Sequence, residues 1–295
     1  MGTDAYTRIG SPRETLAPKP AVEARFTTGA IVRLVRGYGP ATALYVLATS
    51  FTNAAFMADT EDYALSVVNS TGLNEFGHLF WRPLGWLFYQ LLGVRLQQAF
   101  GWEPQTAATA ILIAINWIAG FAAVMLFAAL VRRFVDRGWV VNIAVAGFVL
   151  SHGVLNFSQT GTSYVPGLSF LLLGLLLLIR RAQGEGPRYG GAIAGAAMAA
   201  SVCFWFPYLL ALPAALASPL FIAGWDRRRL RLVTQATLAC GAFGTLSYVI
   251  AIGLLGIHSM AELQAWVAAS SHGTHISGVA RAVFGLARSL VNMGA

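Results

Sequence analysis

Long apolar segments recur along the whole chain and restrict its fold more than any other feature. Eight of them lie at about residues 38–58, 83–100, 107–131, 139–157, 164–179, 191–205, 207–224 and 232–257. A helix of about twenty apolar residues crosses the roughly 30 Å hydrocarbon core of a bilayer. Only 11% of the 295 residues are charged, against about a quarter in soluble domains. The chain is therefore expected to be an all-α polytopic membrane protein.

Basic clusters between the segments indicate which of them span. Three segments are followed by arginines, and the last such cluster reads DRRRLR at residues 226–231. If all eight segments crossed, these clusters would lie opposite the basic N-terminal tail, whereas Lys and Arg tend to stay cytoplasmic. The segment at 83–100 contains Arg95 and two glutamines near its end, so it is expected to lie along the outer surface as an interfacial helix. About seven transmembrane helices remain, with sixteen of the twenty Lys and Arg inside.

The expected organisation has three parts. Residues 1–37 are polar, contain three prolines and lack the apolar core of a signal peptide, which predicts a flexible cytoplasmic tail. Residues 38–257 form the helical membrane domain, with an outer loop at 59–106. Residues 258–295 form an extracytoplasmic segment, where the chain is expected to be truncated. The predicted location is a bacterial inner membrane, and the formal charge of +8 is interpreted as a topology signal that requires no nucleic-acid partner.

The expected outer loop begins with a polar stretch, MADTEDYALSVVNSTGLNEFGHLFWRPLGWL, that contains four of the twelve acids. Asp59, Glu61 and Asp62 follow the first expected span directly, at its outer mouth. His78 and Arg82 are four residues apart, which on a helix places them on one face. These groups suit a site that binds a lipid phosphate and deprotonates an acceptor hydroxyl. The simpler interpretation is a solvated, charged loop.

The order of a span, the ADTEDY loop, HLFWRPLGWL and a span ending in RR resembles the GT-C class of membrane glycosyltransferases. This class includes the protein O-mannosyltransferases and the lipid A aminoarabinose transferases. A second stretch, LSHGVLNFSQTGTSYVPGLSFLLLGLLLLIRR, is similar to a hairpin of the class with a polar outer turn between two spans. The likeness covers about residues 40–230. It departs from the class at Leu79, where relatives have proline, and at Thr160 and Thr162, where they often have glutamate.

The resemblance implies transfer of a sugar from a polyprenyl-phosphate donor to an acceptor on the extracytoplasmic side. Asp59 would be the general base, with Glu61 and Asp62 as alternatives. The residues expected to contact donor phosphate or substrate are His78, Arg82, His152 and Tyr164. For His152 a helix–helix hydrogen bond is the simpler interpretation. A divalent metal is compatible with carboxylate and phosphate oxygens, but no set of metal ligands is predicted. The sugar, the acceptor and the oligomeric state stay open.

Two other functions stay open on the residues alone. One is a lipid-handling protein of the flippase or transporter type, and the other is a non-catalytic scaffold subunit. Ion-coupled transporters place ionisable residues at mid-membrane. The apolar cores of the expected spans between residues 107 and 257 contain no Asp, Glu, Lys or Arg, which argues against ion coupling and not against lipid handling.

Small and sulfur-containing residues within the apolar segments predict packing. Gly191, Gly195 and Ala199 form a four-residue ladder that is typical of close helix contact. Cys203 and Cys240 are interpreted as packing residues and not as a disulfide. The segments on either side of Pro207 are expected either as two short crossings or as a kinked re-entrant pair. His272 and His275 lie three residues apart in the last segment and are interpreted as part of a solvated loop.

Overall fold

The computed structural model describes residues 28–51 and 59–270. The chain divides into two compact units, Met1–Gly37 and Tyr38–Ala295. Of the first unit the structure describes only the start of helix α1 (Thr28–Phe51), which begins before the apolar segment expected from residue 38. His272, His275 and the end of the first expected span lie outside the described residues.

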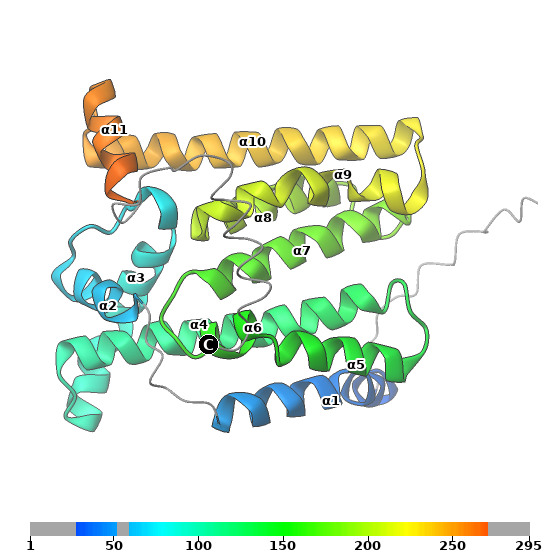
Figure 1. Ribbon diagram of the computed structural model, residues 1–295, viewed down its shortest axis with the longest axis horizontal. Coiled ribbons are helices and arrows are strands. Elements are labelled where there is room, and N and C mark those ends of the chain that lie inside the picture. Colours follow the sequence, from blue (N-terminus) through cyan, green and yellow to red (C-terminus); the bar gives the residue numbers. More distant parts are fainter. Residues whose placement is uncertain (1–27, 52–58, 271–295) are drawn as a thin grey trace, which may run out of the picture. The chain divides into compact units, whose positions relative to one another are not determined.

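Within the described ranges every element is a helix and none is a strand (Figure 1). After α1 the elements are α2 (Thr60–Asn69), η1 (Phe76–His78), α3 (Trp81–Phe100), α4 (Pro104–Val131), α5 (Gly138–Val149), α6 (His152–Phe157), α7 (Tyr164–Ala182), α8 (Gly190–Phe204), η2 (Phe206–Leu210), α9 (Leu212–Ala223), α10 (Arg227–Leu255) and α11 (Met260–Ala269). An all-helical fold suits a bilayer, because a helix satisfies its backbone hydrogen bonds internally.

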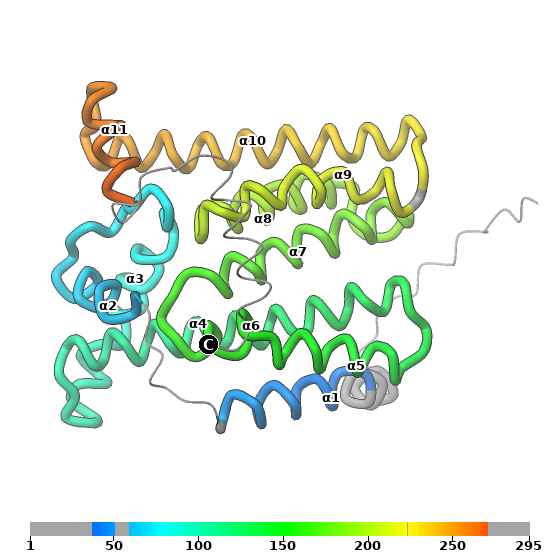
Figure 2. Tube along the Cα trace, viewed as in Figure 1, coloured from blue at the N-terminus to red at the C-terminus, as the bar shows by residue number. Residues whose placement is uncertain are grey.

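The second unit is a bundle in which α4, α5, α7, α8 and α10 run side by side (Figures 1 and 2). Helix α7 packs against α4 and α8, and α8 packs against α10. Helices α2 and α3 pack on the N-terminal part of α4, and η1 contacts α11, so these short elements gather at one end of the bundle. Large side chains on α10 remain uncovered: Leu238 and Leu254 are 68% and 72% exposed. A long uncovered apolar face is suited to lipid.

Within the described residues, three helices, α4, α7 and α10, are long and apolar enough to cross a membrane. Helices α5 and α8 and the segment Phe206–Ile222 are apolar but shorter. The 15 residues of α8 extend about 22 Å at about 1.5 Å per residue, less than the roughly 30 Å hydrocarbon core. Helix α3 is not among the three. The structure therefore supports a helical membrane protein with three candidate spans, and the larger number of about seven stays a prediction.

The expected span at 139–157 is not one continuous helix. Helix α5 ends at Val149 and α6 begins at His152. Ser151 separates them in an extended conformation, and its hydroxyl accepts a hydrogen bond from the Val154 amide. A hydroxyl that caps a new helix start competes with continuation of the preceding helix, which explains the break.

The small-residue ladder lies in the α8–α10 interface, as the sequence predicts. A Cβ atom built on Gly191 would lie 2.7 Å from side-chain atoms of Leu232 and Gln235. One built on Gly195 would overlap the carbonyl oxygen of Ala236. Only glycine permits this approach of two backbones. Both cysteines are buried with free thiols, so their interpretation as packing residues is confirmed.

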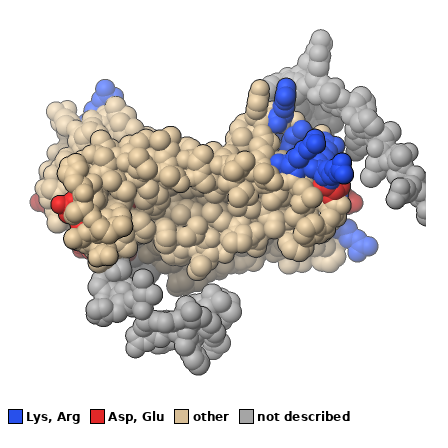
Figure 3. Space-filling model, turned by 90° about the horizontal axis from the view of Figure 1, so that it is seen from above, with Lys and Arg blue, Asp and Glu red and all other residues tan. Residues whose placement is uncertain are grey.

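Charged residues of the second unit gather at its two ends (Figure 3). The α4–α5 connection, the last turn of α7, the α7–α8 connection and the start of α10 with the residue before it together contain ten arginines and three acids. The opposite end, formed by α2, η1, α3, the start of α4 and α11, contains two arginines and six acids. The division of charge between alternate loops of the sequence is therefore also a division in space.

Candidate functional site

The acidic loop folds into helix α2 at one end of the bundle. Asp59 immediately precedes the first turn of α2, and Glu61 and Asp62 lie in that turn. Carboxylates at a helix N-terminus are stabilised by the partial positive charge of its unpaired N–H groups, so their clustering has a local structural cause. Of the three carboxylates expected as the base, Asp59 and Asp62 line one cavity and Glu61 does not. Glu61 and Asp62 are both exposed.

Arg82 lines the same cavity and forms a salt bridge with the carboxylate of Glu75. Its Nη2 atom is 2.8 Å from the Glu75 carboxylate, and its Nη1 atom donates to the Gly72 carbonyl oxygen at 2.9 Å. The guanidinium carbon lies 4.9 Å from the centre of the Tyr63 ring, a cation–π distance. The side chains of Arg82 and Glu75 are only 14% and 10% exposed. Glu75 is one of the four acids of the polar stretch but was not among the expected site residues, because no helical or strand periodicity pairs it with Arg82.

His78 and Arg82 do not share a helical face, so that expectation is wrong. His78 ends the short helix η1, and Arg82 lies in the first turn of α3. The His78 side chain is buried, and its Nδ1 atom lies 2.6 Å from the Ser163 hydroxyl and 3.2 Å from the Phe204 carbonyl oxygen. These contacts connect the segment after the acidic loop to two other parts of the bundle.

The turn between α6 and α7 anchors the acidic loop. The Gly161 amide donates to the Thr60 hydroxyl at 2.8 Å, and the Gly161 carbonyl oxygen accepts from the Trp81 indole at 2.8 Å. From α4, the buried Asn116 amide donates to the Thr162 carbonyl oxygen at 2.6 Å. Thr60 follows Asp59 directly, so the hydrogen bond to Gly161 fixes the start of α2. Helices α2, α3 and α4 thus all bind the α6–α7 turn. This turn fixes the position of Asp59.

Tyr164 lies beside the acidic loop, whereas His152 lies on the surface. The Tyr164 hydroxyl is within interaction range of the Asp59 carboxylate, and its ring centre is 4.8 Å from that of Trp205. His152 is exposed, and its Nδ1 atom is 2.8 Å from the Asn156 amide within α6. Its ring meets the edge of Phe157 at 6.1 Å. Of these two expected site residues, the structure therefore brings Tyr164, and not His152, close to Asp59.

Two hollows of different character lie near the contact between Asp59 and Tyr164, and each of these residues lines one of them. The first, the acidic cavity, has a volume of about 390 Å³. Its lining includes Asp59, Asp62, Tyr63, Glu75, Arg82 and Trp266. The second, the aromatic groove, has a volume of about 450 Å³ and includes Phe148, Phe157, Tyr164, Leu168, Trp205 and Tyr208. Asp59 of the charged cavity thus interacts with Tyr164 of the apolar groove, and a charged site near an apolar one is what an amphiphilic ligand requires.

Trp266 is a site residue that sequence analysis missed. Its indole N–H donates to the Asn74 carbonyl oxygen at 2.8 Å, and its ring meets Phe76 edge-on at 5.4 Å. It comes from α11, which is far along the chain from the acidic loop. No local pattern connects the two segments, so only the fold reveals that α11 covers the cavity.

The electrostatics of the acidic cavity keep Tyr63 neutral. Burial raises the pKa of the Tyr63 phenol well above its usual value, and the negative charges of Asp59 and Glu75 raise it further, while Arg82 lowers it. Among the described residues, the Tyr63 hydroxyl is buried with no hydrogen-bond partner. A buried donor of this kind costs free energy unless a ligand or water satisfies it. The cavity thus offers three carboxylates, one guanidinium and a neutral phenol.

No group of three or more His, Cys, Asp or Glu side chains suited to a metal ion occurs within residues 28–51 and 59–270. Comparisons of the chain with protein-family models, with curated proteins and with solved structures found no match.

Proposed function

We propose that the protein is a membrane glycosyltransferase of the GT-C type that transfers a sugar from a polyprenyl-phosphate donor to an acceptor. In this proposal about seven helices span a bacterial inner membrane, the N-terminus is cytoplasmic and the acidic cavity faces the extracytoplasmic side. The observation that supports it most is the interaction of Asp59, which lines the acidic cavity, with Tyr164, which lines the aromatic groove. A polyprenyl chain suits the groove, and its sugar and phosphate suit the polar cavity.

Asp59 is the base in the proposed reaction. Its carboxylate takes the proton of the acceptor hydroxyl as the acceptor oxygen bonds to the anomeric carbon. The bond from that carbon to the phosphate oxygen breaks, and the phosphate leaves with the electron pair. Thr60 supports this role through its hydrogen bond to Gly161, because a base must be held within hydrogen-bond reach of the proton it removes.

Arg82 is the proposed contact for the departing phosphate. A guanidinium has five N–H donors, and those on Nη1 and Nη2 contact Gly72 and Glu75. Glu75 orients the guanidinium and offsets its charge in the free protein. Because Glu75 offsets part of the guanidinium charge, Arg82 attracts the phosphate of the bound donor less strongly. We expect its contact with the phosphate to strengthen as negative charge develops on the leaving group.

A second candidate function is non-catalytic lipid handling, and the Arg82–Glu75 pair favours it. An arginine already paired at 2.8 Å stabilises the loop whether or not a phosphate binds. In that case the cavity and groove would hold an amphiphile without reaction.

Replacement of Asp59 by Asn separates the two functions. The amide keeps the size of the side chain and removes the proton acceptor, so transfer should fall by about 10² to 10⁴-fold while donor binding persists. The assay measures sugar release from a polyprenyl-phosphate donor, together with donor binding, for the full chain in nanodiscs. Glu61→Gln is the matched control, because Glu61 lies in the same helical turn and is exposed.

Normal transfer by Asp59→Asn would remove the assignment of the base. Loss of transfer in Asp62→Asn alone would move the base to the second carboxylate of the cavity. Donor binding without sugar release by the unaltered protein, over a panel of donors, would favour lipid handling.

A further inference from the structure

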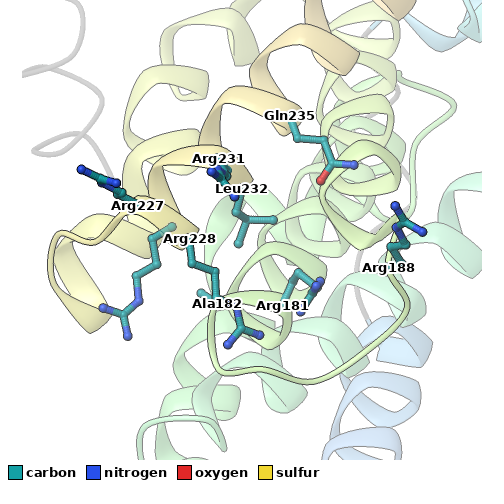
Figure 4. Close-up of a pocket in the computed structure, with 9 residues that line it drawn as sticks. Arg181, Ala182, Arg188, Arg227, Arg228, Arg231, Leu232 and Gln235 are labelled. Atoms are coloured by element: carbon teal, nitrogen blue, oxygen red, sulfur yellow. The ribbon is translucent and has the colours of Figure 1, made fainter.

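A second charged hollow lies at the opposite end of the bundle from Asp59. The α7–α8 connection and the first turns of α10 enclose a cavity of about 590 Å³ (Figure 4). Six arginines line this arginine cavity: Arg181, Arg188, Arg227, Arg228, Arg229 and Arg231. The proposed transfer reaction uses none of them.

Most of these arginines lack an acidic partner. Glu185 pairs with Arg133 at 2.7 Å and with Arg180 at 3.5 Å, outside the lining of the cavity. Asp226 pairs with Arg229 at 2.9 Å. Within the described part of the chain, five lining arginines have no carboxylate within 4.0 Å, namely Arg181, Arg188, Arg227, Arg228 and Arg231. Several like charges around one hollow repel one another unless an anion lies between them.

The arginines reach the hollow from two sides. Arg181 ends α7 and Arg188 precedes α8, whereas Arg228 and Arg231 extend from α10 (Figure 4). The Arg228 guanidinium crosses towards the α7–α8 connection, where a Cβ atom built on Gly184 would lie 3.7 Å from it. The charges therefore converge from separate elements and are not a run along one helix.

Two exposed aromatic residues indicate at which level of the membrane this cavity lies. Tyr189 follows Arg188 and is 66% exposed, and Trp225 precedes the start of α10 and is 73% exposed. Tyrosine and tryptophan concentrate where a membrane protein passes from hydrocarbon to water. Their position beside the arginines places the cavity at the level of lipid headgroups and favours a ligand that is itself part of the membrane.

We propose that the arginine cavity binds the phosphodiester headgroup of an anionic phospholipid. Guanidinium groups bind phosphate oxygens in pairs, and basic pockets between membrane helices on the cytoplasmic side bind anionic headgroups. The shared chemistry is a phosphate anion, which either a lipid or a soluble phosphate could supply. The neighbouring Tyr189 and Trp225 favour the lipid over a soluble phosphate as the ligand.

The test titrates the full chain in neutral detergent with dioleoyl phosphatidylglycerol and, separately, with zwitterionic dioleoyl phosphatidylcholine, and follows bound lipid by native mass spectrometry. The anionic lipid should bind more tightly. Each arginine removed should weaken its binding roughly fivefold, so Arg228→Gln with Arg231→Gln should weaken it about 25-fold. Arg137→Gln is the matched control, because Arg137 lies at the same end and precedes α5 outside the cavity.

Three results would overturn the proposal. One is unchanged binding of phosphatidylglycerol by the double variant, and another is an equal loss in Arg137→Gln, which would indicate diffuse surface charge. The third is displacement of phosphatidylglycerol by inorganic phosphate that binds as tightly as the lipid does. That result would assign the cavity to a soluble anion.

Lysine variants cover the case in which the double glutamine variant does not fold. Arg228→Lys with Arg231→Lys keeps the charge and loses the paired contacts, so its binding should fall between that of the unaltered protein and the glutamine variant. Equal binding by the lysine variant and the unaltered protein would contradict recognition by paired guanidinium contacts. The binding assay requires no sugar transfer, so its outcome is independent of the proposed reaction.

Discussion

At the scale of single residues, one side-chain amide organises the acidic end of the bundle. Asn116 is fully buried in α4. Its Nδ2 atom contacts carbonyl oxygens of the α6–α7 turn, at 3.1 Å to Phe157 and 2.6 Å to Thr162, and also that of Thr160. Buried carbonyl groups in a turn have few other donors within reach, so this amide determines whether the turn keeps its shape.

Replacement of Asn116 by Ala should destabilise the protein by about 1–3 kcal/mol, because buried carbonyl oxygens lose their donor. Thermal unfolding in detergent would measure the change. Asn156→Ala is the control and should have little effect, since its amide bonds the exposed ring of His152. Equal stability of the two variants would mean that the turn holds its shape without Asn116.

Tyr63→Phe should leave the free energy of unfolding unchanged or raise it. The hydroxyl is buried and, in the described residues, has no hydrogen-bond partner, so its removal relieves a desolvation cost. Tyr208→Phe should instead lose about 1 kcal/mol, because its hydroxyl donates to the Tyr164 carbonyl oxygen at 3.0 Å. If the Tyr63 hydroxyl contacts substrate, the Phe variant should also lose sugar transfer while remaining folded. A fall in melting temperature for Tyr63→Phe would show that the hydroxyl has a structural partner.

At the scale of helices, the α8–α10 contact depends on the absence of a side chain at Gly195. A Cβ atom there would meet the carbonyl oxygen of Ala236 and would lie 3.0 Å from the Cys240 amide nitrogen. Backbone atoms of a packed helix cannot move aside as a flexible side chain can, so the two helices would have to separate.

Gly195→Ala should therefore lower the melting temperature and destabilise the fold by roughly 1–3 kcal/mol. Gly241→Ala is a matched control on α10, since nothing lies within 4 Å of a Cβ atom at that position. This second change should be neutral or stabilising by about 0.5–1 kcal/mol, as expected for Gly to Ala inside a helix. A fluorescence-based thermal scan of both purified variants would measure the difference, and similar curves would argue against close backbone contact at Gly195.

At the scale of the whole molecule, the separation of charge defines a topology experiment. The arginine-rich end and the acid-rich end of the second unit should face opposite sides of the membrane, because Lys and Arg stay cytoplasmic. Gln105 at the acid-rich end and Gln183 at the arginine-rich end are both exposed. The native cysteines are buried, so background labelling should be low.

An impermeant maleimide added to intact cells should label Gln105→Cys and should label Gln183→Cys only after lysis. Gln98→Cys, in the exposed part of α3, should behave as Gln105→Cys does if α3 lies outside without crossing. Labelling of Gln183→Cys in intact cells with protection of Gln105→Cys would reverse the proposed orientation.

Part of the candidate site was predictable from the sequence. The first span, the acidic loop and the arginine that follows pointed to Asp59, Asp62 and Arg82, and the structure places these three on one cavity. The assignment of His78 to a shared face with Arg82 failed because the chain ends η1 at His78 and starts a new helix at Trp81. Spacing predicts a shared face only within one uninterrupted helix.

The sequence alone determined the all-helical class, the apolar segments suited to a membrane and the division of charge between the ends, because each depends on residues close together in the chain. Only the tertiary structure decided that Glu75 pairs with Arg82, that Ser163 contacts His78 and that Trp266 covers the acidic cavity. These contacts join separate segments of the chain, and no sequence pattern in one segment indicates its contact with the other. Their distances depend on how the loops dock on the bundle, which packing and buried hydrogen bonds determine for the molecule as a whole.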